Sequence, residues 1–258
     1  EPLFRSASKE NGAGNMTGDS WDNAMPTIQS SLNVAAMNNA VVWVAAGTYY
    51  GDGTSENAFF MKEGVNVYGG FVGNEDADYD LSNRDVATNI SIFDGQYAQR
   101  VLMQRDNFSS TTAAVWDGFT IQNGRVQGYG AGANIKAYGG LSNCIVRNNA
   151  VVNKSGARGA GVYAYGYNSS EKAYIKNCVI EYNNFENSNN IYGGGLYARC
   201  ADVRHTEISH NTSSSHGGGL YAYNYNDFSN CLIYGNNTSA GNGAGVCMNR
   251  LADRKSVV

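Results

Sequence analysis

Hydrophobic and polar residues alternate along the second half of the chain, and each alternating run follows a group of glycines. After the last glycine of "GGGLYAY", Leu220 and Ala222 alternate with Tyr221 and Tyr223. A period of two is typical of a β-strand, in which successive side chains point to opposite faces. We therefore expect a strand after each glycine group, with its small aliphatic residues in the core and its larger residues outside.

Two motifs alternate along the chain, and successive copies of each are 24 to 34 residues apart, which indicates a repeat protein. The glycine motif ends at Gly132, Gly161, Gly195, Gly219 and Gly245. The second motif, as in "NCIVRNN", has its first inward position at Cys144, Cys178, Thr206 and Cys231 and an asparagine at Asn149, Asn183, Asn211 and Asn236. Coils of this length, with short strands and tight turns, predict a right-handed parallel β-helix.

Stacked coils place equivalent residues in ladders about 4.8 Å apart. We expect the asparagine ladder to satisfy backbone groups at one turn and the glycines to allow positive φ at another. Cys144 and Cys178 become stacked neighbours, whose parallel side chains suit a disulfide poorly. We expect them to be buried and reduced.

The first third of the chain predicts a cap on the solenoid. Pro26 suits a helix start, and Ile28, Leu32, Ala35 and Ala36 form one apolar face. Strands are expected at 41–45, within 59–71 and at 90–95, and a protruding acidic loop at 72–89. We expect one domain over 1–258, with the N-terminal segment and capping helix at 1–40 and coils at 41–258. No cap is expected after the last strand, and the chain is expected to be part of a longer protein or to end on a bare coil.

Composition excludes some classes of function. The 258 residues include 32 glycines and carry a net charge of −4, which does not favour nucleic-acid binding. The sequence has no apolar run long enough to predict a membrane span. We expect no cofactor and no bound metal.

The order "PTIQSSL", "VWVAAGTYY", "VNVYGGFVGNE", "ISIFDG" and "GFTIQNG" resembles the start of secreted bacterial right-handed parallel β-helix proteins. The pair "TIQ…AAGTY" is similar to the first turns of pectate-lyase-like enzymes. The alternation of "GGGLYA" with I-x-x-N-N resembles the repeats of polymorphic outer-membrane proteins. The resemblance covers about residues 15–250 and implies an exported, extracellular or cell-surface protein; such families include adhesins and polysaccharide-active enzymes.

Outward tyrosines are the first candidate site. The repeats place Tyr163, Tyr197 and Tyr221 in one column, and Tyr165, Arg199 and Tyr223 in the next. An exposed aromatic array can bind sugar rings through ring faces and hydroxyls. The alternative is purely structural, since stacked aromatic pairs stabilise a fold by roughly 0.5–1.5 kcal/mol each.

A catalytic alternative uses Glu181, Glu207 and His205. The two glutamates are expected outside on adjacent coils, roughly 8 Å apart, which lies within the range for an inverting glycosidase. A surface salt bridge from Arg147 to Glu181 is the competing interpretation. His205, His210 and His216 fall within one coil, but we expect them to point in different directions. Asp94, Asp106 and Asp117 cannot be assembled with an arginine into a lyase site.

The leading hypothesis is a non-catalytic, adhesin-like surface protein that binds a glycan or another surface component through the tyrosines. The first alternative is a polysaccharide lyase or glycoside hydrolase. The second is a structural spacer without a ligand.

Overall fold

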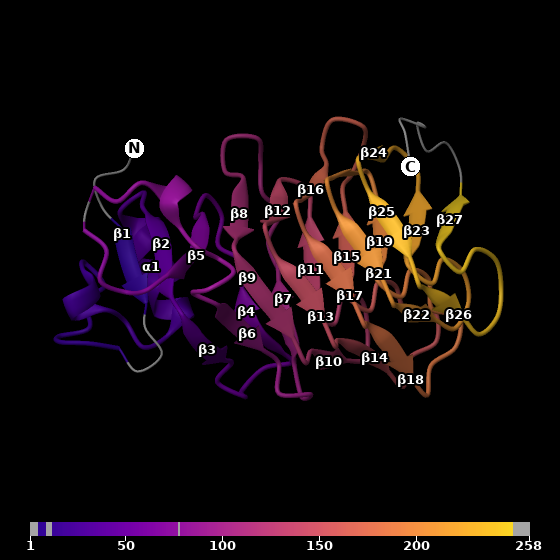
Figure 1. The fold of residues 1–258 in the computed structure, drawn as a ribbon, viewed down its shortest axis with the longest axis horizontal. Coiled ribbons are helices and arrows are strands. Elements are labelled where there is room, and N and C mark those ends of the chain that lie inside the picture. The colour runs from indigo at the N-terminus through magenta and orange to yellow at the C-terminus, as the bar shows by residue number, and fades with distance from the viewer. Residues whose placement is uncertain (1–4, 9–11, 77, 250–258) are drawn as a thin grey trace.

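The computed structural model describes residues 5–8 by their backbone, and residues 12–76 and 78–249 in full. Almost all regular structure in these ranges is parallel β-sheet, wound into a β-helix (Figure 1). The expected absence of a C-terminal cap concerns residues 250–258, which lie outside the described ranges.

Each coil contributes strands to three long parallel sheets. Sheet A contains β1 (Arg5–Ser8), β2 (Val41–Ala45), β5 (Val67–Phe71), β8 (Ala114–Asp117), β12 (Gly139–Ser142), β16 (Ala173–Lys176), β20 (Ala201–Arg204) and β24 (Asp227–Ser229). Sheet B contains β3 (Gly47–Tyr50), β6 (Ser91–Asp94), β9 (Phe119–Gln122), β13 (Ile145–Arg147), β17 (Val179–Glu181), β21 (Glu207–Ser209) and β25 (Leu232–Tyr234). Sheet C contains β4 (Asn57–Phe60), β7 (Arg100–Met103), β11 (Ala133–Lys136), β15 (Val162–Tyr165), β19 (Leu196–Arg199), β23 (Leu220–Tyr223) and β27 (Val246–Asn249).

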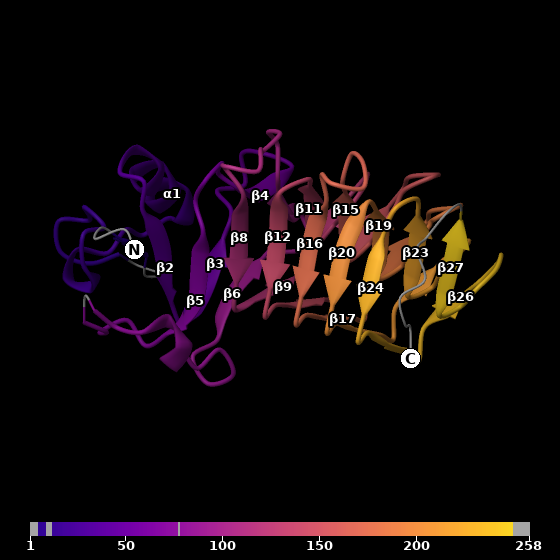
Figure 2. The ribbon, with the colours of Figure 1, turned by 90° about the horizontal axis from the view of Figure 1, so that it is seen from above.

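Shorter strands connect sheet B to sheet C. They are β10 (Arg125–Val126), β14 (Ala150–Val152) and β18 (Asn184–Glu186), followed by the pair β22 (Thr212–Ser213) and β26 (Asn237–Thr238). In Figure 1 the strands of sheet B lie at the front and point downwards. In Figure 2, seen from above, the strands of sheet A point towards the lower edge of the picture, which is the front of Figure 1. Each coil advances from the N-terminal to the C-terminal end in this sense, so the helix is right-handed, as predicted.

The expected asparagine ladder forms at the turn after sheet B. Asn183 Nδ2 donates to Asn211 Oδ1 at 2.9 Å and to the Val146 carbonyl at 3.0 Å, while its Oδ1 accepts from Asn149 Nδ2 at 2.9 Å. Asn211 repeats the pattern with Asn236. Because Asn149, Asn183 and Asn211 are fully buried, the ladder satisfies backbone groups that water does not reach.

Glycines form the corner before sheet C, as expected. The first glycine of each group has positive φ, for example 59° at Gly159 and 70° at Gly193. The last glycine of the group faces the asparagine ladder: a Cβ added at Gly161 would lie 2.7 Å from Asn183 Nδ2 and 2.6 Å from the Gly195 carbonyl oxygen. The two sequence motifs therefore pack directly against each other.

A second turn uses left-handed residues other than glycine. Asn143, Asn177, His205 and Asn230 have φ between 49° and 52° and lie between sheets A and B. His205, which belongs to the catalytic alternative, therefore lies in a turn and not on a strand, because β20 ends at Arg204 and β21 begins at Glu207. Asparagine tolerates this backbone conformation better than most residues, which explains its recurrence here.

One hydrophobic cluster runs along the solenoid from Ile28 to Cys231. It contains Cys144, Cys178 and Cys231 in one column, each at most 2% exposed, and all five cysteines of the chain are free thiols. The expectation of buried, reduced cysteines is confirmed. Burial raises the pKa of the Cys144 thiol well above its ordinary value, which keeps it protonated.

Helix α1 (Ile28–Met37) packs on the N-terminal end of this cluster, as the sequence predicts. Thr27 caps it by accepting from the Ser30 amide. Ile28, Leu32 and Ala35 are buried, but the fourth inward position is Ser31, because Ala36 is exposed. No helix within the described residues is both long and apolar enough to cross a membrane.

The segment 72–89 forms the expected loop and contains the short helix η2 (Leu81–Asn83). The contacts that hold this loop against sheet A were not predicted from the sequence. Arg84 Nη2 lies 2.9 Å from Asp117 Oδ1, and its guanidinium carbon lies 4.9 Å from the Tyr68 ring centroid. A second aromatic cluster joins Trp21, on helix η1 (Trp21–Asn23), to Trp43 and Phe71.

Candidate functional site: the tyrosine face

Sheet C presents the six predicted binding residues on its outer side. Strand pairing places Tyr163, Tyr197 and Tyr221 side by side in one column. Tyr165, Arg199 and Tyr223 occupy the next column, two residues further along each strand. The alternating residues between them, such as Val162 and Ala164, are in the core. The predicted assignment of inward and outward side chains is therefore correct on these strands.

The central column is stacked and buried. The ring centroids of Tyr163 and Tyr197 are 5.3 Å apart, and those of Tyr197 and Tyr221 are 5.5 Å apart, with planes inclined by 22° and 11°. These side chains are only 8%, 3% and 7% exposed. The prediction that this column is exposed is thus wrong. Neighbouring rings cover each other's faces, so a sugar ring has no free tyrosine face to stack on here.

The second column is half-buried, so its side chains are partly accessible to solvent. The guanidinium carbon of Arg199 lies 4.3 Å from the Tyr165 ring centroid, which is a cation–π contact. Its Nε is enclosed and has no hydrogen-bond partner within the described part of the chain. The stacking holds this guanidinium in one orientation while leaving its hydrogen-bonding capacity incompletely used.

A third column completes the surface and was not assigned to the site from the sequence. Tyr129 stacks on Tyr163 at 5.1 Å. The guanidinium carbon of Arg158 lies 5.1 Å from the Tyr197 ring centroid and 5.6 Å from that of Tyr129. Arg158 therefore sits against the central column on the side opposite Arg199.

The same column continues through two further aromatic residues. Tyr192 pairs with Arg158 through a backbone bridge and meets Tyr221 edge-on at 5.1 Å. His216 stacks on Tyr192 at 5.7 Å, and its Nδ1 accepts from the Asn242 amide. A sequence signal for the column existed, since Arg158, Tyr192 and His216 each stand three residues before the last glycine of a group. We call the surface formed by all three columns the tyrosine face.

Burial keeps the inner phenols protonated. It raises the pKa of Tyr163 and of Tyr197, although the positive charge of Arg158 opposes both shifts. The central column therefore offers neutral hydroxyl groups, which can donate hydrogen bonds, beside two permanent cations.

The alternative catalytic residues lie on sheet B. Strand pairing places Glu207 beside Val179 and Glu181 beside Ser209, so the carboxylates are diagonal neighbours on adjacent coils, as predicted. Glu207 Oε1 accepts from the Tyr234 hydroxyl at 2.6 Å and from Ser209 Oγ at 3.1 Å. These bonds anchor Glu207 in a surface network rather than aim it into a cleft.

Arg147 and the three histidines have separate partners. Arg147 donates to Gln122 Oε1 through Nε and Nη2, at 3.2 and 3.1 Å, on the side away from Glu181. His205 Nε2 lies 2.9 Å from Asn230 Nδ2, whereas His210 stacks on Tyr182 at 5.1 Å. With His216 on the tyrosine face, the histidines point in different directions, as expected.

The early aspartates are also dispersed among structural partners. Asp117 pairs with Arg84, whereas Asp94 Oδ2 accepts from Gln122 and Asn123. Asp106 lies at another position, beside Arg105 and Lys62. Within the described ranges, no group of three or more His, Cys, Asp and Glu residues is arranged to hold a metal ion.

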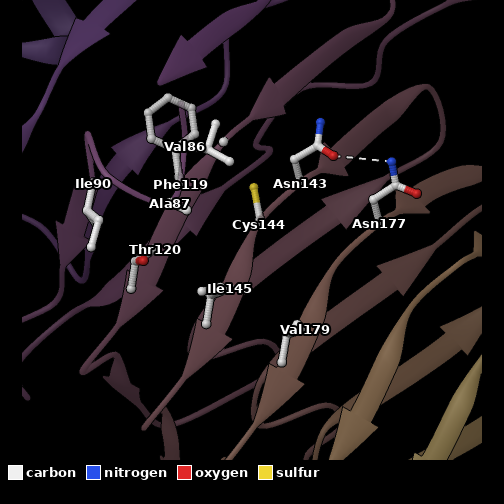
Figure 3. Close-up of a pocket in the computed structure, with 11 residues that line it drawn as sticks. Val86, Ala87, Ile90, Phe119, Thr120, Asn143, Cys144, Ile145, Asn177 and Val179 are labelled. Atoms are coloured by element: carbon white, nitrogen blue, oxygen red, sulfur yellow. Dashed lines mark hydrogen bonds between the residues drawn. The ribbon is translucent and has the colours of Figure 1, made fainter. Parts of the chain in front are cut away.

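A shallow groove of about 230 Å³ lies on sheet B beneath the 72–89 loop. Figure 3 shows Val86 and Ile90 on one side of it, and Thr120, Ile145 and Val179 along the strands. Asn177 donates to Asn143 at one end, at 3.1 Å. The groove is largely apolar and lacks paired acids, which does not favour glycosidic chemistry.

Comparisons with known proteins give no match. No protein-family model, no curated protein and no solved structure matches this chain. The case for a function therefore depends on the side chains described above.

Proposed function

We propose that this protein is an exported, adhesin-like surface protein that binds a glycan or another surface component, without catalysis, through its tyrosine face. The observation that supports this most is the row of phenol groups between Arg158 and Arg199. Tyrosine hydroxyls and guanidinium groups are hydrogen-bond donors that suit the oxygen-rich surface of a sugar chain. The repeats that resemble those of secreted β-helix proteins support export to the cell surface.

The covered ring faces change the expected mode of binding. A ligand would contact hydroxyl edges and the half-buried residues Tyr165, Arg199 and Tyr223, and not the faces of the central rings. The row follows the solenoid axis, because each coil adds one residue to each column. A long, repetitive ligand lying along this axis could make the same contact on successive coils.

The test is a glycan-array screen of the folded protein beside Tyr165→Ala/Tyr223→Ala. These substitutions remove half-buried aromatic rings and leave the central stack in place. We expect the wild type to bind a defined set of glycans and the double variant to lose at least tenfold in affinity. Tyr50→Ala, which removes an exposed tyrosine from sheet B, is the control and should bind like the wild type.

Two outcomes would overturn the proposal. Absence of binding by the folded wild type would favour a spacer role, in which the tyrosines only stabilise the coils. Release of reducing ends or of unsaturated sugars from a bound glycan would favour an enzyme, and Glu181→Gln and Glu207→Gln would then be the first variants to assay.

A further inference from the structure

The tyrosine face is positively charged, although the chain carries a net charge of −4. Its two arginines project from adjacent coils, Arg158 before β15 and Arg199 at the end of β19. None of the outward positions of the three columns on these coils and their neighbours holds an acidic residue: Tyr129, Asn134, Lys136, Arg158, Tyr163, Tyr165, Tyr192, Tyr197, Arg199, His216, Tyr221 and Tyr223.

The two guanidinium groups are also not neutralised by ion pairs. Within the described residues, the ion pairs involve Arg84, Arg100, Arg125, Lys172 and Arg204. Arg158 and Arg199 instead lie against aromatic rings. Cation–π contact orients a guanidinium but leaves its donor edge able to bind an oxyanion. Lys136 differs, because its ammonium already donates to the Arg105 carbonyl and to Asn107.

Phenol hydroxyls between the arginines add neutral donors. Arg158 and Arg199 flank the central column from its two sides, so an anionic group above Tyr163 or Tyr197 would have a cation on either side. Both arginines also act electrostatically on Tyr163. Charge-assisted hydrogen bonds from guanidinium to an oxyanion are about twice as strong as neutral ones. A ligand with regularly spaced anionic groups would use this arrangement better than a neutral sugar.

We infer that the tyrosine face prefers anionic glycans, with Arg158 and Arg199 contacting carboxylate or sulfate groups of the sugar chain. This inference rests on the proposed glycan-binding function and specifies its ligand class. No metal ion is required, because the positive charge comes from the protein itself.

The experiment compares one sugar backbone in three forms. Cello-oligosaccharides of equal length are used unmodified, oxidised to carboxylates at C6, or sulfated at C6, and their affinities are measured by calorimetry. We expect both anionic forms to bind about tenfold or more tightly than the unmodified form. Comparing the carboxylated with the sulfated form identifies which anionic group fits better. Raising the salt concentration should weaken binding of the anionic forms only.

Variants then assign the preference to the two arginines. Arg158→Gln and Arg199→Gln should each weaken binding of the anionic forms by roughly five- to thirtyfold, and Arg199→Lys should restore part of the loss. Arg147→Gln on sheet B is the matched control, since it removes the same charge from another face, and it should change affinity less than twofold. Circular dichroism and thermal unfolding establish that each variant is folded.

The results separate this inference from the proposed function. Equal affinity for charged and uncharged forms, with no effect of either arginine variant, would overturn the anionic preference while glycan binding stands. Absence of binding by the anionic forms, together with uncharged hits on the glycan array, would overturn the anionic preference in the same way. Absence of any glycan binding would overturn both.

Discussion

At the scale of single residues, the last glycine of the motif that ends at Gly161 is explained by the asparagine that it faces. Gly161 has no room for a side chain, because a Cβ would lie 2.6 Å from the Gly195 carbonyl oxygen and 2.7 Å from Asn183 Nδ2. Gly245 holds the same position in the last motif, yet the nearest atom to a Cβ there, among the residues that the structure describes, would be Ile233 Cγ2 at 3.8 Å. The space available for a side chain therefore differs sharply between Gly161 and Gly245.

This difference gives a matched pair of substitutions. Gly161→Ala should lower the free energy of unfolding by about 1–3 kcal/mol, because neither the backbone nor the buried ladder can move away cheaply. Gly245→Ala should leave it unchanged or raise it by up to about 1 kcal/mol, since alanine restricts the unfolded chain. Urea denaturation measures both, and equal effects of the two substitutions would contradict the packing argument.

The asparagine ladder makes a second prediction at this scale. Asn183→Ala removes hydrogen bonds to Asn149, Asn211 and the Val146 carbonyl, and leaves buried groups without partners. We expect a loss of about 3 kcal/mol or more in the free energy of unfolding. Asn184→Ala, one residue further on and exposed, should cost less than about 0.5 kcal/mol. A small effect of Asn183→Ala would show that water replaces the ladder.

At the scale of elements, the stacked tyrosines link three strands of sheet C outside the hydrophobic core. Burial raises the pKa of Tyr163 and Tyr197 because it disfavours the charged phenolate. The folded chain thus keeps these protons at a pH where the unfolded chain loses them. Stability from this source is fully present below the unfolded tyrosine pKa of about 10 and is lost as the pH rises beyond it.

We therefore expect the wild type to lose stability between pH 9 and pH 11, measured by urea denaturation at each pH. Tyr197→Phe removes one of the responsible hydroxyls and keeps the ring stack, so its stability should fall less over this interval. Tyr50→Phe, which changes an exposed tyrosine of β3, should follow the wild type. Identical slopes for the wild type and Tyr197→Phe would show that the phenol ionises without unfolding the stack.

The repeats explain which elements could be predicted from the sequence. Alternation after each glycine group fixes the side of sheet C to which Tyr163 and Tyr197 point, because the strand period is two. It does not fix their exposure, which depends on what the neighbouring column contributes. Tyr129 and Arg158 cover the rings, and they come from a turn segment that has no strand period. All six candidate residues were therefore placed on the correct side of sheet C, but the three tyrosines of the central column are less exposed than expected.

At the scale of the whole molecule, the repeat predicted the solenoid but not its contacts outside the repeat. Each coil meets equivalent residues of the next, so one motif determines many contacts. The ion pair of Arg84 with Asp117 joins an irregular loop to β8 across 33 residues. No periodic signal marks such a pair. The pairing of β1 with β2 was missed for the same reason, since β1 precedes the first recognisable coil.

The accessibility of the free thiols to a reagent shows which coils of the solenoid are folded. Cys144, Cys178, Cys200 and Cys231 are buried, whereas Cys247 on β27 is partly exposed. Burial also raises the pKa of Cys144, Cys200 and Cys231, which disfavours the reactive thiolate. A thiol reagent should therefore reach the buried cysteines only after the coils that enclose them open.

We expect Ellman's reagent to label one thiol per chain in native buffer and all five in concentrated guanidinium chloride without reductant. Cys247→Ser should abolish the native labelling and leave four thiols after unfolding. Rapid labelling of a second thiol in the native wild type would show that a coil opens before the others. Fewer than five thiols in the unfolded, unreduced wild type would instead reveal a disulfide and contradict the ladder of reduced cysteines.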